Sequence, residues 1–235
     1  MDGLALKMII DKYVSGCALQ NNRLWSDPVA FRISWNEAAA STEEEFAQKL
    51  NALRKWTSFV DDSRIRTPFR FLCECSTVEP VRVQNCLNEL FNEDECSIDA
   101  KQSKIDHYIA ETERLRMQYK PESRIRANDQ RSAMALLWLY DPDSNYFLSP
   151  KASKLFAKSI GLNEKWGTNT NFKLKIYCQF CDEVIDQLRR DKTLMDFHLR
   201  RFDGSGVLHP DKNLHILLAD LITATSSNPK GKGMD

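Results

Sequence analysis

Four cysteines are spaced closely enough to suggest metal chemistry. Cys178 and Cys181 form a C-x-x-C pair, and Cys73 with Cys75 forms a C-x-C pair. Two such pairs could supply four thiolates to zinc in tetrahedral geometry. The C-x-x-C pair, however, lies in a stretch from 172 to 188 whose apolar residues recur every four positions, which predicts a regular helix. We therefore interpret these thiols as small core residues and predict no metal site.

The total number of cysteines favours the same interpretation. Seven cysteines are an odd number, and they are spread along a chain whose N-terminus lacks the basic-then-apolar layout of a signal peptide. Free thiols in a reducing compartment suit this pattern better than a disulfide framework. The sequence therefore predicts a cytoplasmic location.

Other catalytic signatures are missing. No glycine-rich phosphate loop is present, no serine lies in a G-x-S-x-G elbow, and the four histidines show no H-E-x-x-H spacing. We interpret the histidines as solvated side chains next to charged residues: His107, His198, His209 and His215. The prediction is a protein without catalytic residues and without a cofactor.

A local basic stretch is the feature most suggestive of a ligand. Within 114–131, six cations face only two anions, and lysines follow two aromatic residues a little later in the chain. Such a mixture can track a phosphate backbone while aromatic rings stack on bases. An ordinary solvated helix face explains the same basic residues equally simply. The candidate nucleic-acid contacts are Arg124, Arg126, Arg131, Lys151 and Lys154, with Tyr146 and Phe147 as stacking rings.

Composition sets wide limits on partners. The 33 basic residues balance 33 acidic ones, so no overall field attracts nucleic acid or an anionic membrane, and binding of either would need a local patch. The longest apolar runs are far shorter than the roughly 20 residues that span a bilayer. We expect no membrane association.

Apolar periodicity and capping signals predict a mostly α-helical fold. Ser41 stands three residues before Glu44, as in a capping box, and Pro80 and Pro150 suit first helical positions. The run 133–140 (AMALLWLY) is apolar on all sides, which predicts a buried central helix. Residues 20–41 show no sustained period and are expected to form a loop. The expected fold is an irregular domain of seven or eight helices, with at most one short strand or hairpin.

The same pattern suggests how the chain is divided. We expect a small N-terminal subdomain over 1–59, a helical recognition domain over 60–224, and a disordered tail or linker over 225–235, where glycine, proline, serine and lysine leave nothing to bury.

From about residue 69 onward the order of features resembles a known family. An apolar helix ends in NELFNE (88–93), and RSAMALLWLYDP (131–142) is followed by NYF (145–147). KASKLFAK (151–158) and a late helix LHILLADL (214–221) complete the pattern. Together they resemble the N-terminal region of McrB-like AAA+ ATPases of modified-DNA restriction and related defence systems. The family's motor, with its phosphate loop, is absent from this chain, and LSPK (148–151) stands where the family usually has a tyrosine–lysine pair.

The resemblance implies binding and not chemistry. We therefore expect a non-catalytic recognition module of a modified-DNA restriction or phage-defence system, with DNA, modified or not, as the ligand. An AAA+ motor and a nuclease subunit are the implied protein partners. Two alternatives stay open: a protein–protein interaction or scaffold module, and a divergent nuclease whose site is assembled only in three dimensions.

Overall fold

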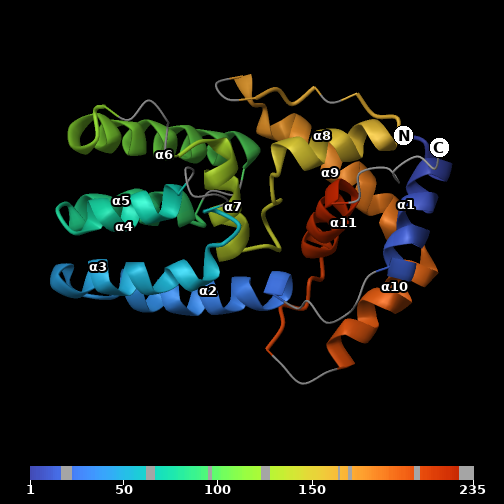
Figure 1. Ribbon diagram of the computed structural model, residues 1–235, viewed down its shortest axis with the longest axis horizontal. Helices are drawn as coiled ribbons and strands as arrows, with labels where there is room; N and C mark the ends of the chain where they lie inside the picture. The colour runs from blue at the N-terminus through green and yellow to red at the C-terminus, as the bar shows by residue number, and fades with distance from the viewer. Residues whose placement is uncertain are drawn as a thin grey trace, which may run out of the picture. The chain divides into compact units, whose positions relative to one another are not determined.

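The computed structural model describes residues 1–16, 23–61, 67–94, 97–122, 128–163, 165–168, 171–203 and 207–227. Within these ranges the chain is mostly helical and contains no strand (Figure 1), which confirms the expected class. The expected number of seven or eight helices is wrong. The described ranges contain eleven α-helices, α1 (Gly3–Gly16), α2 (Arg23–Ala39), α3 (Glu43–Ala52), α4 (Pro68–Ser76), α5 (Pro80–Phe91), α6 (Ile98–Tyr119), α7 (Gln130–Tyr140), α8 (Pro150–Ser159), α9 (Leu174–Leu188), α10 (Lys192–Leu199) and α11 (His215–Ser227), and two short 3-10 helices, η1 (Leu53–Trp56) and η3 (Arg200–Asp203).

The expected loop over 20–41 is largely helix α2, and this correction has a physical reason. Pro28 lies inside α2, where it removes a backbone donor and normally costs about 3 kcal/mol. Trp25, Phe31 and Trp35 are buried at helical spacing on either side of that proline. Burial of these large rings outweighs the local penalty, so tertiary packing overrides the sequence signal. Of the other ten helices, α4 and α10 were also missed, as both are too short to show a sustained period.

The expected capping box at Ser41 does not form. The N-cap of α3 is Thr42, and the Ser41 hydroxyl donates instead to the Ala38 carbonyl at 2.6 Å. Ser41 therefore closes the last turn of α2 and does not open α3. Pro80 and Pro150 do occupy the first turns of α5 and α8, as predicted.

The chain divides into two compact units whose boundaries differ from the expected 59/60 division. Unit 1 comprises Met1–Trp25 and Phe147–Asp235, and unit 2 comprises Ser26–Tyr146. Residues 59 and 60 both lie within unit 2, so this position does not separate the units. Of the expected tail 225–235, residues 225–227 belong to α11, and the rest lies outside the described residues.

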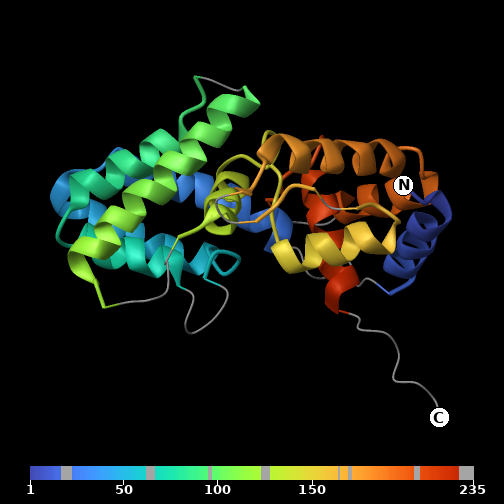
Figure 2. The ribbon, with the colours of Figure 1, turned by 90° about the horizontal axis from the view of Figure 1, so that it is seen from above.

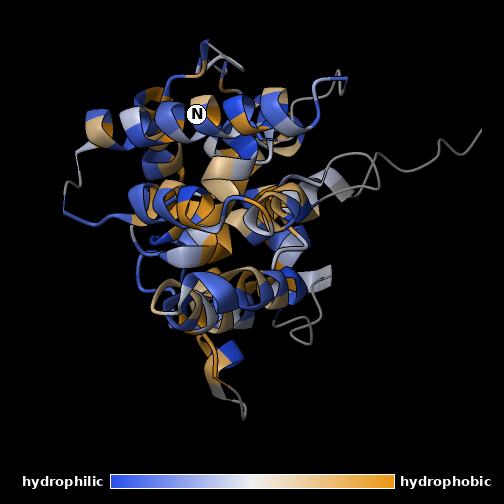
Figure 3. Cartoon of the chain, turned by 90° about the vertical axis from the view of Figure 1, so that its left-hand side faces the viewer, coloured by the Kyte–Doolittle hydropathy of each residue, from blue (hydrophilic) through white to orange (hydrophobic). Residues whose placement is uncertain are grey.

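Unit 2 is built around α7. Every residue from Arg131 to Leu139 is buried, as the apolar run predicted. Asp129 caps the helix through a reciprocal pair of bonds with Ser132, at 3.1 and 2.9 Å. At its other end the Tyr140 ring stacks on Phe91 of α5, with ring centroids 4.6 Å apart. In Figure 3 apolar and polar residues alternate along the helices, as expected for amphipathic packing.

In unit 1, α11 packs on both α8 and α9, and side chains of α8 and α9 also touch each other. The Phe156 and Phe180 ring centroids lie 6.4 Å apart, and the Ser153 and Tyr177 hydroxyl oxygens lie 3.2 Å apart. Both contacts join residues separated by 24 positions, so α8 and α9 run in the same direction. The connection between them carries the chain back to the end where α8 began (Figure 2). In both units, none of the described helices is long and apolar enough to cross a bilayer.

His198 lies in the core of unit 1, which corrects the expectation that it is solvated. Its ring is 2% exposed and packs against Phe202, with centroids 5.2 Å apart. Burial, reinforced by the nearby Arg201 charge, lowers the pKa of His198 to about 4. The Asp211 carboxylate, 3.8 Å away, already accepts the Ile216 and Leu217 amides and caps α11. His198 is therefore neutral in the folded protein at neutral pH.

This burial predicts a pH-dependent stability. Since the unfolded chain takes up the His198 proton near pH 6.5 and the folded chain only near pH 4, stability is full above pH 6.5 and is lost as the pH falls toward 4. Between pH 7 and pH 5 we expect the free energy of unfolding to fall by about 2 kcal/mol from this group. Urea unfolding followed by circular dichroism measures the change. A His198→Gln variant retains the effects of all carboxylates, so it should lose less stability over the same interval; an equal loss in both proteins contradicts the assignment.

Candidate nucleic-acid interface

The arginines predicted to contact nucleic acid do not form a described surface. Arg124 and Arg126 lie outside the described residues. Arg131 is only 7% exposed, and its guanidinium donates to the backbone carbonyls of Phe59 at 3.2 Å and Val60 at 2.7 Å. Arg131 therefore ties the segment after η1 to the first turn of α7. The structure corrects its expected role as a phosphate contact.

The two predicted stacking rings are also buried. Tyr146 is 8% exposed and Phe147 is 9% exposed. The Phe147 carbonyl accepts a 2.6 Å bond from the Tyr177 hydroxyl, which anchors this segment to α9. Neither ring presents a face on which a base could stack. Their sequence position next to lysines suggested a binding platform, but the structure uses them as core residues.

Lys151 and Lys154, by contrast, lie on the outer side of α8. Pro150 at the first helical position starts the helix, and Ala152, Phe156 and Ala157 form its buried side. The lysines occupy the remaining side, where Lys151 is exposed and Lys154 is half-buried. The helix period thus separates the apolar contacts of α8 from its charges.

The parallel arrangement of α8 and α9 adds two further lysines at this end of unit 1. The shared offset of 24 residues places the first turn of α9 at the same end of unit 1 as the first turn of α8, so Lys151 and Lys175 both lie at that end, and Lys173 directly precedes α9. Lys173 and Lys175 are both exposed. We call Lys151, Lys154, Lys173 and Lys175 the lysine surface. Sequence reasoning missed its second half because more than twenty residues separate Lys151 from Lys173 along the chain.

Three of the four lysines of this surface carry a charge that no described ion pair cancels. Lys151, Lys173 and Lys175 make no ion pair with any residue that the structure describes. The exposed carboxylates of α9, those of Asp182, Glu183 and Asp186, come two or more turns later. The start of α9 also carries the positive end of a 15-residue helix dipole. The exposed charges of the first turns of α8 and α9 are therefore cationic.

No zinc ligand set is assembled in the described part of the chain. Groups of three or more His, Cys, Asp and Glu that could hold a metal ion do not occur there. Cys73 and Cys75 lie in α4, and Cys178 and Cys181 lie in α9, inside a helix as the periodicity predicted. Burial raises the pKa of Cys73 to about 12 and that of Cys75 to about 11. Both groups are thus neutral thiols at physiological pH.

No protein-family model, curated protein or solved structure matched the chain. The functional argument consequently rests on the geometry and charge of the lysine surface.

The placement of Arg131 predicts a loss of stability on truncation. An Arg131→Ala substitution leaves the Phe59 and Val60 carbonyls without their donor inside the protein, so we expect the free energy of unfolding to fall by about 3 kcal/mol. Urea unfolding monitored by far-ultraviolet circular dichroism provides the measurement. The control is Lys151→Ala, which removes an equal charge from an exposed position and should stay within about 0.5 kcal/mol of the wild type. Unchanged stability of the arginine variant argues against the anchoring role.

Proposed function

We propose that the chain is a non-catalytic module that binds the phosphate backbone of DNA through the lysine surface. The observation that carries this proposal is that α8 and α9 run in the same direction, so the lysines at their starts lie at one end of unit 1. Ammonium groups gathered at one end of a unit can contact phosphates of the same DNA molecule. Lysine suits this task as a compact point charge on a flexible stem.

The chemistry predicts how binding depends on salt. Each lysine that neutralises a phosphate releases condensed counterions, so the logarithm of the binding constant falls linearly with the logarithm of salt concentration. For four contacts on duplex DNA the slope is about −3.6. Phosphate contacts fix position and carry no base information. Any preference for sequence or modification therefore has to come from other residues, among which Arg124 and Arg126 remain candidates.

The wider setting follows from the resemblance to McrB-like N-terminal regions. In that setting the module delivers a restriction or phage-defence complex to DNA, while an AAA+ motor and a nuclease subunit supply the energy and the cleavage. The divergent-nuclease alternative gains no support from the described residues, which contain no cluster of three or more His, Cys, Asp or Glu side chains that could hold a metal ion.

One observation favours protein interaction as a second candidate function. In unit 2 the Tyr119 hydroxyl, near the end of α6, donates to Glu79 at 2.7 Å, so the end of α6 lies beside the start of α5. Large apolar side chains are exposed around this junction: Val78, Val81, Met117 and Tyr119. A protein partner could cover them. This surface lies in a different unit from the lysine surface, so the two functions can be tested separately.

The DNA proposal predicts a specific loss on charge removal. A Lys151→Gln/Lys175→Gln variant should bind DNA at least tenfold more weakly at low salt, and its salt slope should be less steep by about 2, because two phosphate contacts are lost. Fluorescence anisotropy of labelled single-stranded and duplex DNA, methylated and unmethylated, measured across a salt series, gives both quantities.

A matched control distinguishes the effect of losing the lysine surface from the effect of lowering the net charge. Lys12 and Lys192 are exposed lysines of the same unit, on α1 and at the start of α10, so Lys12→Gln/Lys192→Gln removes the same charge elsewhere. The control should retain wild-type affinity and slope. Equal weakening in both variants, or no binding by the wild type even at low salt, would overturn the proposal and leave protein interaction as the better candidate.

A further inference from the structure

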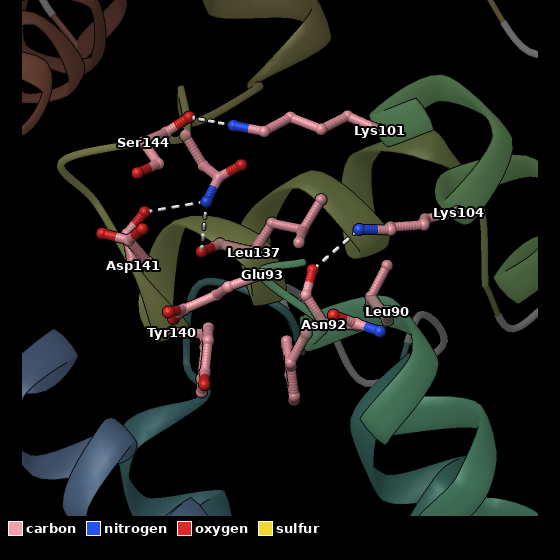
Figure 4. Close-up of a pocket in the computed structure, with 11 residues that line it drawn as sticks. Leu90, Asn92, Glu93, Lys101, Lys104, Leu137, Tyr140, Asp141 and Ser144 are labelled. Atoms are coloured by element: carbon pink, nitrogen blue, oxygen red, sulfur yellow. Dashed lines mark hydrogen bonds between the residues drawn. The ribbon is translucent and has the colours of Figure 1, made fainter. Parts of the chain in front are cut away.

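Unit 2 contains a cavity where the ends of α5 and α7 meet the start of α6. Its volume is about 190 Å³, and Figure 4 shows side chains from all three helices around it. The apolar part of the wall comes from Leu90, Phe91 and Leu137, and the charged part from Lys101, Lys104, Glu93 and Asp141. A cavity of this size is smaller than the roughly 300–1,000 Å³ of sites for drug-sized ligands. It fits a molecule of amino-acid size.

Lys101 brings a positive charge to this cavity that no carboxylate neutralises. Its ammonium donates a 2.5 Å bond to the Ser144 carbonyl and makes no ion pair with the residues described. A carbonyl oxygen is a neutral acceptor, and an ammonium has three donors, so two donors remain for a ligand. One turn along α6, the Lys104 ammonium donates to the Asn92 carbonyl at 2.8 Å.

Asp141 brings the opposite charge to the same cavity. It is the C-cap of α7, and its carboxylate makes no hydrogen bond or ion pair within the described part of the chain. Its backbone is held in place, since the Asn145 amide donates to the Asp141 carbonyl at 2.9 Å. In Figure 4 Asp141 lies at the end of α7, while the two lysines extend from α6 and the Lys101 ammonium reaches Ser144. Lys101 and Asp141 are more than 4.0 Å apart and do not pair directly.

Glu93 differs from Asp141 in having its charge compensated. It forms a 2.7 Å ion pair with Arg32, whose guanidinium also lies over the Tyr140 ring at 4.6 Å from the centroid. With Phe91 stacked on the ring's other side, Tyr140 has both faces covered. The wall here is rigid, and Asp141 is the anion available to a ligand.

The geometry points to a binding site for a small zwitterion, an aliphatic α-amino acid. Its carboxylate bonds to Lys101, its ammonium bonds to Asp141, and its side chain lies against Leu90 and Leu137. A ligand with only a negative charge is attracted by Lys101 but repelled by Asp141. A ligand with only a positive charge is attracted by Asp141 but repelled by Lys101. A molecule carrying both charges satisfies the two groups at once. This inference concerns unit 2 and does not depend on DNA binding.

Isothermal titration calorimetry with three probes of one carbon skeleton tests the site. L-leucine carries both charges, 4-methylpentanoate lacks the ammonium, and 3-methylbutylamine lacks the carboxylate. We expect saturable binding of leucine, at least tenfold weaker binding of the other two, and cross-peak shifts near Leu90 and Leu137 in ¹⁵N-resolved spectra. Equal binding of all three probes, or no saturable binding of leucine, valine or isoleucine, overturns the proposal.

Substitutions test whether leucine binds in this cavity, and circular dichroism shows whether each variant is folded. Asp141→Asn changes the charge without removing a native bond, and Lys101→Arg keeps the charge that Lys101→Gln removes. Leucine affinity should fall at least tenfold in Asp141→Asn and Lys101→Gln, and Lys101→Arg should retain most of it. Lys49→Gln, on exposed α3 of the same unit, is the control and should bind normally. Unchanged affinity in both Asp141→Asn and Lys101→Gln, with wild-type circular dichroism, also overturns the proposal.

Discussion

The lysine surface depends on one buried hydroxyl, that of Tyr177. This side chain is fully buried, and burial raises its pKa well above the ordinary value, so the hydroxyl stays protonated and remains a donor. It donates to the Phe147 carbonyl at 2.6 Å and lies 3.2 Å from the Ser153 hydroxyl oxygen. An unpaired polar group in this position would cost about 1–3 kcal/mol, so the pairing strongly favours one register of α8 against α9. That register brings lysines distant in sequence to one end of unit 1.

The cavity of unit 2 depends on a different constraint, the unpaired carbonyls at helix C-termini. The last carbonyls of a helix have no partner within it and must find donors elsewhere. At the end of α7 the Asn145 amide donates to the Leu137 and Asp141 carbonyls, at 3.3 and 2.9 Å. Beyond the end of α5, Lys104 donates to the Asn92 carbonyl. Lys104 and Asn145 both line the cavity, so side chains that satisfy the carbonyls at these helix ends also form part of its wall.

Helices whose ends carry capping residues or prolines were predicted from the sequence. Helices that are stabilised mainly by tertiary packing were missed. The helices over 80–91, 98–119, 133–140 and 149–160 were expected from prolines, caps and apolar stripes, and α5, α6, α7 and α8 confirm them. Helix α2 was not predicted because Pro28 interrupts its apolar pattern. The helix is stabilised by burial of Trp25 and Phe31, which the local sequence does not reveal. Predicting the exposed position of Lys151 required only the helix period. Predicting that Lys175 lies at the same end of unit 1 required the relative direction of two helices, which the sequence does not display.

Arg131 and Lys151 show why residue type alone did not locate the candidate site. Both were predicted to contact phosphates, yet one is buried and the other exposed. A guanidinium offers five donors in a rigid plane and is weakly hydrated, so it can enter the core when several carbonyls meet it, as those of Phe59 and Val60 do here. An ammonium is strongly hydrated and stays at the surface unless it is paired. In a chain with zero net charge, solvated lysines are therefore the cations most able to meet an anionic polymer, and a local excess of them at one end of unit 1 creates a field that the whole-chain charge conceals.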